Sequence, residues 1–411
     1  MHVGILGAGV IGITTAYSLL RRGMRVTVID RASGVAQGAS FGNGGQLSYS
    51  YVNPLASPDL LKGLPRMIVG GDPAFRIQYA PSIKLVQWGL QFLMNCRSAA
   101  TARNTARLTR LAIFSRTALH RIVEEHNLDF HFRRNGKIVL LASTADLSHA
   151  RNACEMKNTL GCAMRVLDRS ALIDLEPSLA DGPNDFVGGI YAAIDEAGDS
   201  HAFVQRLVDL CHRSPDFHLH LGTNIKQIRP GSRRITAIET DQGDFTADAY
   251  VLALGAESPL MTRNLRLNLP IYPLKGYSVT VPIGEGAPVA SVTDSRNRTV
   301  FCALGDDLRI AGIAELVGYD QRVEQKRIDQ LIRLAQKRFP GGGDYATVIN
   351  RWQGWRPLTP SSLPLIGPAP QYDNLFINAG HGLFGWTLAC GSAELIAEWM
   401  NGKETARVAF R

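Results

Sequence analysis

The sequence lacks the cysteine and histidine patterns by which proteins commonly bind structural metals. Its six cysteines are scattered with no C-x-x-C pair, and no H-E-x-x-H or histidine-rich segment occurs. Isolated cysteines of this kind are typical of reduced, mostly buried thiols in a cytosolic protein. We therefore predict no metal site.

Long apolar runs are also missing. Residues 3–20 carry no charge, but four glycines interrupt them and no basic segment precedes them. This pattern favours a strand, a turn and a helix over a signal peptide or a membrane span. The chain has 411 residues, 45% of them hydrophobic, which is enough for two or three globular domains. We expect a cytoplasmic protein.

Acidic residues are absent between Pro73 and Val123, where the eight basic residues together equal the formal net charge of the whole chain, +8. One interpretation is a solvated helix surface. The other is a surface that meets anionic lipid or an acidic partner, which would place the protein peripherally on the inner face of the cell membrane. We expect no nucleic-acid partner, because no recognised binding module accompanies the stretch.

The chain begins with a nucleotide-binding pattern. Gly7, Gly9 and Gly12 form G-x-G-x-x-G between an apolar strand and a helix, and Asp30 ends a second strand about 20 residues later. The glycines permit a tight turn and close approach of the backbone to a pyrophosphate at the helix N-terminus, while the carboxylate can bind a ribose. The predicted cofactor contacts in this unit are Val3, Leu6, Gly7, Ala8, Gly9, Val10, Ile11, Gly12, Asp30 and Arg31.

Three later segments are predicted to reach the same cofactor. Residues 38–48 are small and polar, as expected of a loop laid against a flat ligand, although a plain surface turn is the alternative. A strand ends at Gly255, and Gly380-His381-Gly382 precedes the last helix, whose N-terminus would stabilise the negative charge of a reduced flavin. The predicted contacts here are Ser40, Asn43, Gly45, Gln46, Leu47, Ile225, Gly255, Gly380, Gly382, Leu383 and Trp386.

Arg356 is the best candidate for binding the substrate. It lies between Trp355 and Pro357, which would restrain a guanidinium that binds a carboxylate in bidentate fashion. A surface arginine in a loop is the alternative. Tyr51 and Tyr277 could add hydroxyl groups, and His381 could contact the reacting groups or serve only in packing. These four residues are the candidate catalytic residues.

Residues 58–128 are predicted to be helical and to carry two apolar stripes at i, i+3 and i+4 spacings. The first comprises Ile83, Val86, Trp88, Leu90, Leu93 and Met94, and the second Leu108, Leu111, Phe114, Ala118 and Ile122. We interpret both as core, with a membrane-facing flap as the alternative. Alternating β-branched, aromatic and polar residues over 271–281 and 299–313 predict an antiparallel sheet.

The sequence resembles the FAD-dependent D-amino acid dehydrogenases, within the wider D-amino acid oxidase, glycine oxidase and sarcosine oxidase superfamily. The resemblance runs along essentially the whole chain. The segments that carry it are GAGVIG with VTVID, GASFGNGGQLSYSYVNPLASP, YPLKGYSVTVP, GWRPLTPSSLPLIG and NAGHGLFGWTLACGS.

The resemblance implies an α/β protein with a discontinuous Rossmann-type FAD-binding domain (1–50, 195–265 and 360–411) and an antiparallel-sheet substrate domain (51–194 and 266–359). It implies oxidation of a small D-amino acid to an imino acid, which water hydrolyses to a 2-oxo acid and ammonia. Arg356 would take the carboxylate-binding role, and segments 39–47 and 380–386 would contact the flavin.

Two departures from the family pattern refine these expectations. A linking His in the Asn43 loop and a linking Cys near Gln353 are both absent, so we expect non-covalent FAD. Ser361-Ser-Leu-Pro replaces the Asp-Gly-Thr-Pro of broad-specificity relatives, which favours a cyclic D-imino acid such as D-proline or 4-hydroxy-D-proline. Electrons would pass to a quinone or another respiratory carrier. The alternatives are an O₂-using oxidase of the glycine or sarcosine type, and a flavin subunit of a larger dehydrogenase.

Overall fold

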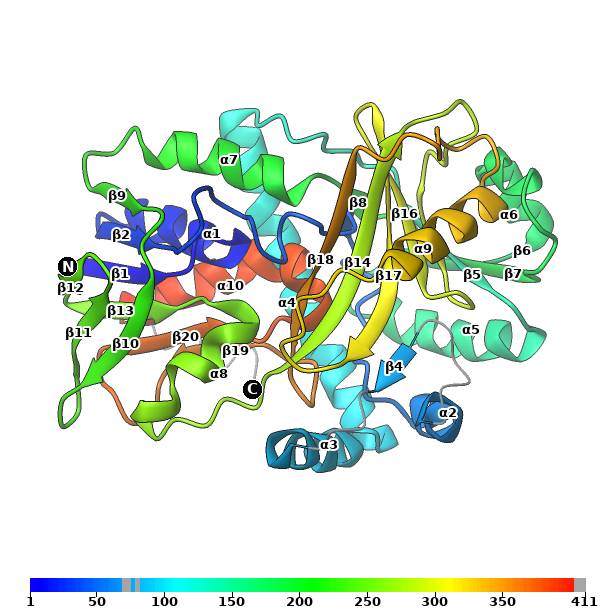
Figure 1. The fold of residues 1–411 in the computed structure, drawn as a ribbon. Helices are drawn as coiled ribbons and strands as arrows, with labels where there is room; N and C mark the ends of the chain where they lie inside the picture. Colours follow the sequence, from blue (N-terminus) through cyan, green and yellow to red (C-terminus); the bar gives the residue numbers. More distant parts are fainter. Residues whose placement is uncertain (69–74, 78–81, 403–411) are drawn as a thin grey trace.

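The structure of the protein, a computed structural model, describes residues 1–68, 75–77 and 82–402. It contains two large sheets that lie side by side and share a cavity (Figure 1). Within the described residues, no helix has both the length and the apolar character needed to cross a bilayer.

The first large sheet is the nucleotide-binding type of sheet that the N-terminal pattern predicts. Its order is β19-β20-β13-β1-β2-β9, and all neighbours are parallel except the edge strand β19. Near-continuous apolar strands such as β1 are buried on both faces, as parallel strands usually are. Its strands are β1 (His2–Leu6), β2 (Arg25–Ile29), β9 (Phe217–His220), β13 (Ala249–Leu252), β19 (Leu365–Pro368) and β20 (Leu375–Ala379).

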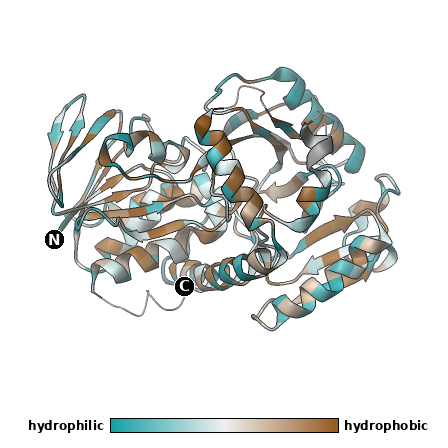
Figure 2. Ribbon diagram, turned by 90° about the horizontal axis from the view of Figure 1, so that it is seen from below, coloured by the Kyte–Doolittle hydropathy of each residue, from teal (hydrophilic) through white to brown (hydrophobic). Residues whose placement is uncertain are grey.

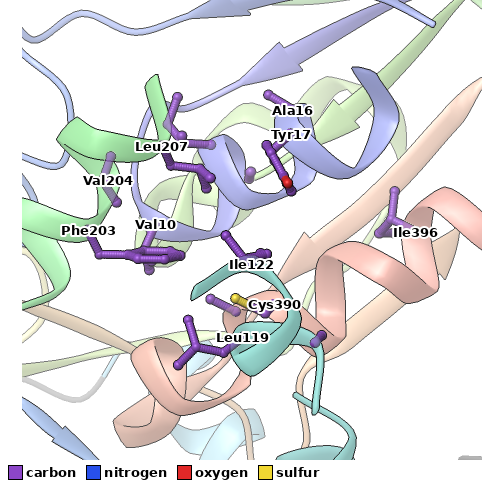
Figure 3. Packing of buried hydrophobic residues seen from close by; sticks show 14 of the residues in the cluster. Val10, Ala16, Tyr17, Leu119, Ile122, Phe203, Val204, Leu207, Cys390 and Ile396 are labelled. Atoms are coloured by element: carbon purple, nitrogen blue, oxygen red, sulfur yellow. The ribbon is translucent and has the colours of Figure 1, made fainter. Parts of the chain in front are cut away.

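Helices cover one face of this sheet, and a small sheet covers the other. The helices are α1 (Val10–Leu20), α7 (Ser200–Cys211) and α10 (Gly385–Met400), whose apolar side chains interdigitate with those of α4 (Ser98–His126) in one core (Figure 3). The small sheet consists of β10 (Ile225–Pro230), β11 (Ile235–Thr240) and β12 (Gly243–Phe245). A two-stranded sheet joins β3 (Gln46–Leu47) to β8 (Glu196–Ala197).

The second large sheet has nine strands, with β14 (Tyr272–Pro282) between β18 (Asn350–Leu358) and β17 (Asp307–Leu316). Helix α9 (Gln325–Arg338) packs on one face of this sheet, and the other face borders the cavity. The remaining strands are β4 (Phe75–Ile77), β5 (Lys137–Leu141), β6 (Met164–Asp168), β7 (Gly188–Ala192), β15 (Ser291–Asp294) and β16 (Thr299–Leu304). Three further helices are α5 (Thr144–Asn158), α6 (Arg169–Leu175) and the short α8 (Ser258–Met261).

The strands of each large sheet fall within the residue ranges expected for one domain. Helix α4 is the exception, because it lies in the range expected for the substrate domain but packs against α10. At the contact, a Cβ on Gly391 of α10 would stand 2.9 Å from Cα of Ser115 on α4. A close helix crossing therefore attaches α4 to the nucleotide-binding core.

The predicted helical region 58–128 is not continuous. It contains α2 (Pro58–Ile68), the short strand β4, α3 (Ile83–Asn95) and α4. The core interpretation of the α4 stripe is confirmed for four of its residues, which are buried: Leu108, Leu111, Ala118 and Ile122.

The core interpretation of the first stripe is wrong. On α3 only Trp88 of the predicted set is buried, together with its neighbour Phe92. The other five residues are exposed: Ile83, Val86, Leu90, Leu93 and Met94. Helical spacing identified an apolar face correctly, but spacing does not reveal whether another element covers that face.

Candidate active site

A cavity of about 1520 Å³ lies between the two large sheets, and its lining includes Asp30, which follows β2, and Arg356 on β18. Most of the predicted site residues line it. They are Gly7, Gly9, Val10, Ile11, Asp30, Arg31, Ser40, Asn43, Gln46, Tyr51, Ile225, Gly255, Arg356, His381, Gly382, Leu383 and Trp386.

The turn between β1 and α1 needs glycine for reasons that the structure makes explicit. Gly7 has φ +111°, and a Cβ on it would stand 2.6 Å from the carbonyl oxygen of Ala253. A Cβ on Gly12 would stand 1.8 Å from the oxygen of Gly7, so only glycine lets α1 pack this closely on the turn. The N–H groups of the first helical turn, which have no helical partners, therefore begin directly at the cavity wall.

The end of the cavity beside this turn has ready hydrogen-bonding groups. The Asp30 carboxylate accepts hydrogen bonds from the backbone N–H of Ala8 at 2.7 Å and of Ala32 at 2.8 Å, one on each oxygen. A carboxylate oxygen can accept more than one hydrogen bond, so Asp30 can still bind a ribose. The Ser40 hydroxyl accepts from the N–H of Val10 at 3.0 Å, which ties the later loop to the helix start.

Seven predicted cofactor contacts do not line the cavity and act as support for it instead. Ala8 and Gly12 shape the turn, and a Cβ on Gly45 would stand 3.0 Å from Sγ of Cys302 in the antiparallel sheet. Gly380 has φ +81° and approaches the Thr359 side chain. The remaining three, Val3, Leu6 and Leu47, are buried strand residues.

The loop that follows β2 is held from the second sheet by two residues that sequence patterns did not indicate. Arg309 Nη1 on β17 donates to the carbonyl oxygens of Asn43 at 2.8 Å and Phe41 at 3.3 Å. Lys137 Nζ on β5 donates to Oε1 of Gln46 at 2.7 Å. Lys137 lies more than 90 positions from its partner in the sequence, and Arg309 lies further still from its own. No local signal could therefore have revealed these contacts.

Tyr51 lies at the cavity wall beside a buried group of charges. Its ring centroid is 5.1 Å from Nζ of Lys137 and 5.8 Å from Nζ of Lys157, distances at which cations interact with an aromatic face. Desolvation lowers the pKa of each lysine to about 8. The Asp195 carboxylate accepts from the N–H of Ser50 at 2.6 Å, and its burial raises its own pKa.

Arg356 lies in the cavity wall as a cation without a carboxylate partner among the described residues. Its Nη1 donates to the carbonyl oxygen of Ile313 at 3.1 Å, and desolvation lowers its pKa to about 10. Arg356 is half-buried, and a partly desolvated cation without a counter-ion would favour binding of an anionic ligand. The guanidinium passes over Gly276 of β14. Glycine within a strand often marks the close approach of another group, and this was the one signal in the sequence for the contact.

The carbonyl that orients Arg356 belongs to a strained residue. Ile313 has φ +57°, a left-handed conformation that β-branched residues rarely adopt. It lies where the β14–β17 register shifts between Lys275 and Tyr277, so β17 bulges at this point. No sequence pattern predicts this bulge.

Tyr277 does not reach the cavity, which corrects its predicted role as a substrate contact. Successive side chains of a strand point to opposite faces, and Gly276 faces Arg356 while Tyr277 lies in the core beneath α9. Its hydroxyl donates to Oε2 of Glu315 at 2.9 Å. Glu315 is itself paired with Arg327 at 2.8 Å, so Tyr277 belongs to a buried structural network.

His381 lies at the cavity but is a neutral, hydrogen-bonded side chain. Burial lowers its pKa to about 3. Its Nε2 is 2.9 Å from Oγ of Ser392, whose own proton is donated to the carbonyl of Leu388 at 2.8 Å. Nε2 therefore carries the ring proton, and this nitrogen is not available as a base. Trp386 also lines the cavity, while its Nε1 donates to the carbonyl of Gly198 at 2.9 Å.

The cavity has the parts that a dinucleotide carrying a flat ring system requires. The α1 N-terminus and Asp30 line it, and so does the loop that contains Asn43 and Gln46. The start of α10 lines the cavity through Gly385 and Trp386, and His381 and Gly382 line it just before this helix. Gly255 has φ +54° and open space at its Cβ position. The residues present therefore fit FAD together with a small substrate at Arg356.

Comparisons with known proteins agree with this fit. Residues 2–399 match the family model DAO, described as FAD dependent oxidoreductase. The chain is 39% identical to a D-amino acid dehydrogenase of Methylobacterium nodulans, over 98% of this chain and 96% of the relative. It is 37% identical to a D-amino acid dehydrogenase of Neisseria meningitidis, over 98% of this chain and 97% of the relative.

Solved structures share the fold. Glycine oxidase from Geobacillus kaustophilus superimposes with a TM-score of 0.75 at 23% identity, covering 99% of this chain and 97% of that one. L-proline dehydrogenase from P. horikoshii superimposes with a TM-score of 0.77 at 18% identity, covering 100% and 97%. At these identities the likeness establishes the architecture of the two sheets and no more.

Proposed function

This chain belongs to the DAO family of FAD-dependent oxidoreductases, and from that premise we propose that it is a dehydrogenase that converts D-amino acids to 2-oxo acids. The observation that carries the proposal is Arg356, a cation in the cavity wall without a carboxylate partner among the described residues. A substrate carboxylate would supply the missing counter-ion. The amino acid would lose a hydride and a proton, and water would hydrolyse the resulting imino acid to the 2-oxo acid and ammonia.

FAD, when bound, supplies the two-electron acceptor for this oxidation. The first turn of α1 and Asp30 would hold its pyrophosphate and ribose, and the loop from Ser40 to Gln46 would hold its ring system. We expect this binding to be non-covalent. The chain would contribute mainly orientation and electrostatics, because Arg356 can fix the carboxylate and thereby the position of the substrate Cα.

Neither Tyr51 nor His381, the other candidate residues that line the cavity, supplies a strong base. His381 is neutral and its Nε2 is protonated, and the Tyr51 hydroxyl has a pKa raised by burial. The reaction therefore favours a substrate whose amine is neutral on binding or becomes so in the site. We propose that Tyr51 and His381 shape the site, just as we propose that Arg356 binds the substrate carboxylate.

We further propose a preference for cyclic D-imino acids such as D-proline or 4-hydroxy-D-proline. Support comes from the Ser361-Ser-Leu-Pro segment and from the apolar wall around Arg356, formed by Leu274, Ile313 and Leu358. Such a wall would accommodate a compact apolar ring. Electrons would then pass to a quinone or another respiratory carrier, with the protein in the cytoplasm and peripheral on the inner face of the cell membrane.

The direct test is anaerobic bleaching of the visible flavin band. D-alanine, D-proline and 4-hydroxy-D-proline would each be added beside the L-form, and rapid bleaching by D-forms only is expected. Absence of bleaching by every compound, with FAD bound, would contradict the proposal and point to a sarcosine-like substrate or to a subunit that depends on partner chains. Stoichiometric peroxide formation in air would identify an O₂-using oxidase instead.

A further inference from the structure

Helix α3 separates the cavity from the protein surface and is apolar on both sides. Trp88 and Phe92 face inward, are buried and line the cavity. On the outward side, the exposed fractions are 78% for Ile83, 50% for Val86, 59% for Leu90 and 55% for Met94. Exposed apolar side chains at helical spacing are unusual in a soluble surface and indicate a binding surface. Figure 2 views the molecule from below, the side on which Figure 1 places α3, and colours the ribbon by the hydropathy of each residue.

Positive charge borders the exposed face at both ends. Lys84 is exposed in the first turn of α3, and Arg97 is exposed at the junction with α4. No acidic residue occurs in the sequence from Pro73 to Val123. The nearest acidic side chain on α2, Asp59, pairs with Lys62 at 3.0 Å and so leaves no net negative charge there. This distribution matches an anionic surface.

The cavity reaches the same face. Leu93 lines the cavity and is also exposed, and Leu60 and Gly63 of α2 line the cavity opposite α3. Figure 1 shows α2 and α3 at the same lower edge of the molecule, below the antiparallel sheet. The cavity lining also includes the apolar residues Phe75 and Ile77 of β4. Because Leu93 is both exposed and part of the lining, whatever covers the outer face of α3 would also adjoin the cavity at Leu93.

We propose that the outer face of α3 (Ile83, Val86, Leu90 and Met94, bordered by Lys84 and Arg97) lies in the interface of an anionic lipid bilayer, so that a lipid-soluble quinone enters the cavity beside Leu93. The entry of a quinone rests on the proposed function. The quinone takes up two electrons and two protons to become a quinol, the same number that the amino acid loses on becoming the imino acid. An interfacial helix of this type buries its apolar face at the headgroup boundary and is held by basic flanks.

A second copy of this chain is a poorer occupant of the surface. In a two-fold symmetric contact the same patch would occur on both subunits. Lys84 and Arg97 would then face the same cations of the other copy without acidic residues to neutralise them. A bilayer that contains anionic lipid supplies both the apolar medium and the negative charge.

The test is flotation of the FAD-loaded protein with vesicles of phosphatidylcholine alone or with added phosphatidylglycerol, in low and high salt. Binding to the anionic vesicles is expected, with the partition coefficient reduced about tenfold or more in Val86→Ser/Leu90→Ser. Lys84→Gln/Arg97→Gln should weaken binding mainly at low salt. Val289→Ser, which alters an exposed apolar residue in the loop between β14 and β15, serves as the matched control and should float like the wild type.

Turnover measurements distinguish a failure of the docking proposal from a failure of the proposed function. Activity with a water-soluble dye should be unchanged in the α3 variants, while the apparent KM for a long-chain quinone in vesicles should rise. Failure of the wild type to float with anionic vesicles, or equal flotation of the Val86→Ser/Leu90→Ser variant, would overturn docking even if D-amino acids bleach the flavin. A dimer that the Leu90→Ser substitution dissociates would assign the surface to self-association instead. An unchanged quinone KM in a variant that no longer floats would overturn the entry route alone.

Discussion

The guanidinium of Arg356 lies directly over Gly276, so that a Cβ at position 276 would stand 2.4 Å from Cζ of Arg356. The two residues are on adjacent strands, β18 and β14, where Arg356 pairs with Leu274 and Gly276 lies two positions further along β14. The missing side chain of Gly276 is therefore the space that the Arg356 side chain occupies. The contact joins Arg356 of the candidate site to Gly276, a residue that sequence patterns did not identify as part of the site.

Gly276→Ala should displace the Arg356 guanidinium and raise the KM for the amino acid. The same substitution should raise KM much less in the Arg356→Ala background, because the two substitutions act on one group and are not additive. Steady-state kinetics of the single and double variants provide the measurement. Additive effects on KM would contradict the relationship.

Arg356→Ala should raise KM about a hundredfold to a thousandfold, as expected when one partner of a buried charge pair is removed. FAD should remain bound, because Arg356 is on the antiparallel sheet and is not part of the turn and loop that would hold the cofactor. Arg351→Ala, on the same strand but exposed, is the control and should leave KM unchanged. Wild-type kinetics in Arg356→Ala would end the assignment of a carboxylate-binding role.

His381 should make the folded protein less stable in mild acid. Its pKa is about 3 in the folded state against 6.5 as the ordinary value, so below pH 6.5 the unfolded chain binds more protons. This residue should therefore lower the free energy of unfolding by about 2 kcal/mol between pH 7 and pH 5. Denaturant titrations at several pH values should show a shallower dependence in His381→Gln, whose amide can still donate to Ser392. An identical slope in both proteins would argue against a neutral buried His381.

Lys137→Met should weaken FAD binding about tenfold to a hundredfold, because it removes a charged hydrogen bond to Gln46. The dissociation constant can be measured by flavin fluorescence on reconstitution of the apoprotein. Lys226→Met, at an exposed position of β10, is the control. Equal affinities would show that the loop holds its conformation without Lys137.

Acid precipitation of the FAD-loaded protein should leave all of the flavin in the supernatant. Cys302 is the thiol nearest to Gly45 of the predicted flavin loop, but burial raises its pKa to about 11. A protonated thiol is a poor nucleophile toward a flavin ring. Yellow colour retained by the pellet would contradict non-covalent binding.

Local patterns predicted the features that arise within short stretches of chain. The turn from Gly7 to Gly12 and the carboxylate of Asp30 belong to one continuous unit, so glycine geometry and strand periodicity were sufficient. The same holds for the strands of the antiparallel sheet, whose alternation appears directly in the sequence. Arg356 could be singled out because its neighbours Trp355 and Pro357 form a recognisable segment.

Tertiary structure decided everything that depends on which face of an element is covered. Tyr277 and Gly276 are adjacent in sequence, but strand geometry sends one into the core beneath α9 and leaves the other beneath Arg356. The apolar stripe of α3 was visible in the sequence, whereas its exposure depends on the absence of a covering element among the described residues. The sequence by itself thus determined the chemistry and periodicity of each segment. Long-range packing determined which side chains meet, because partners such as Arg309 and Asn43 are joined only by the folded backbone.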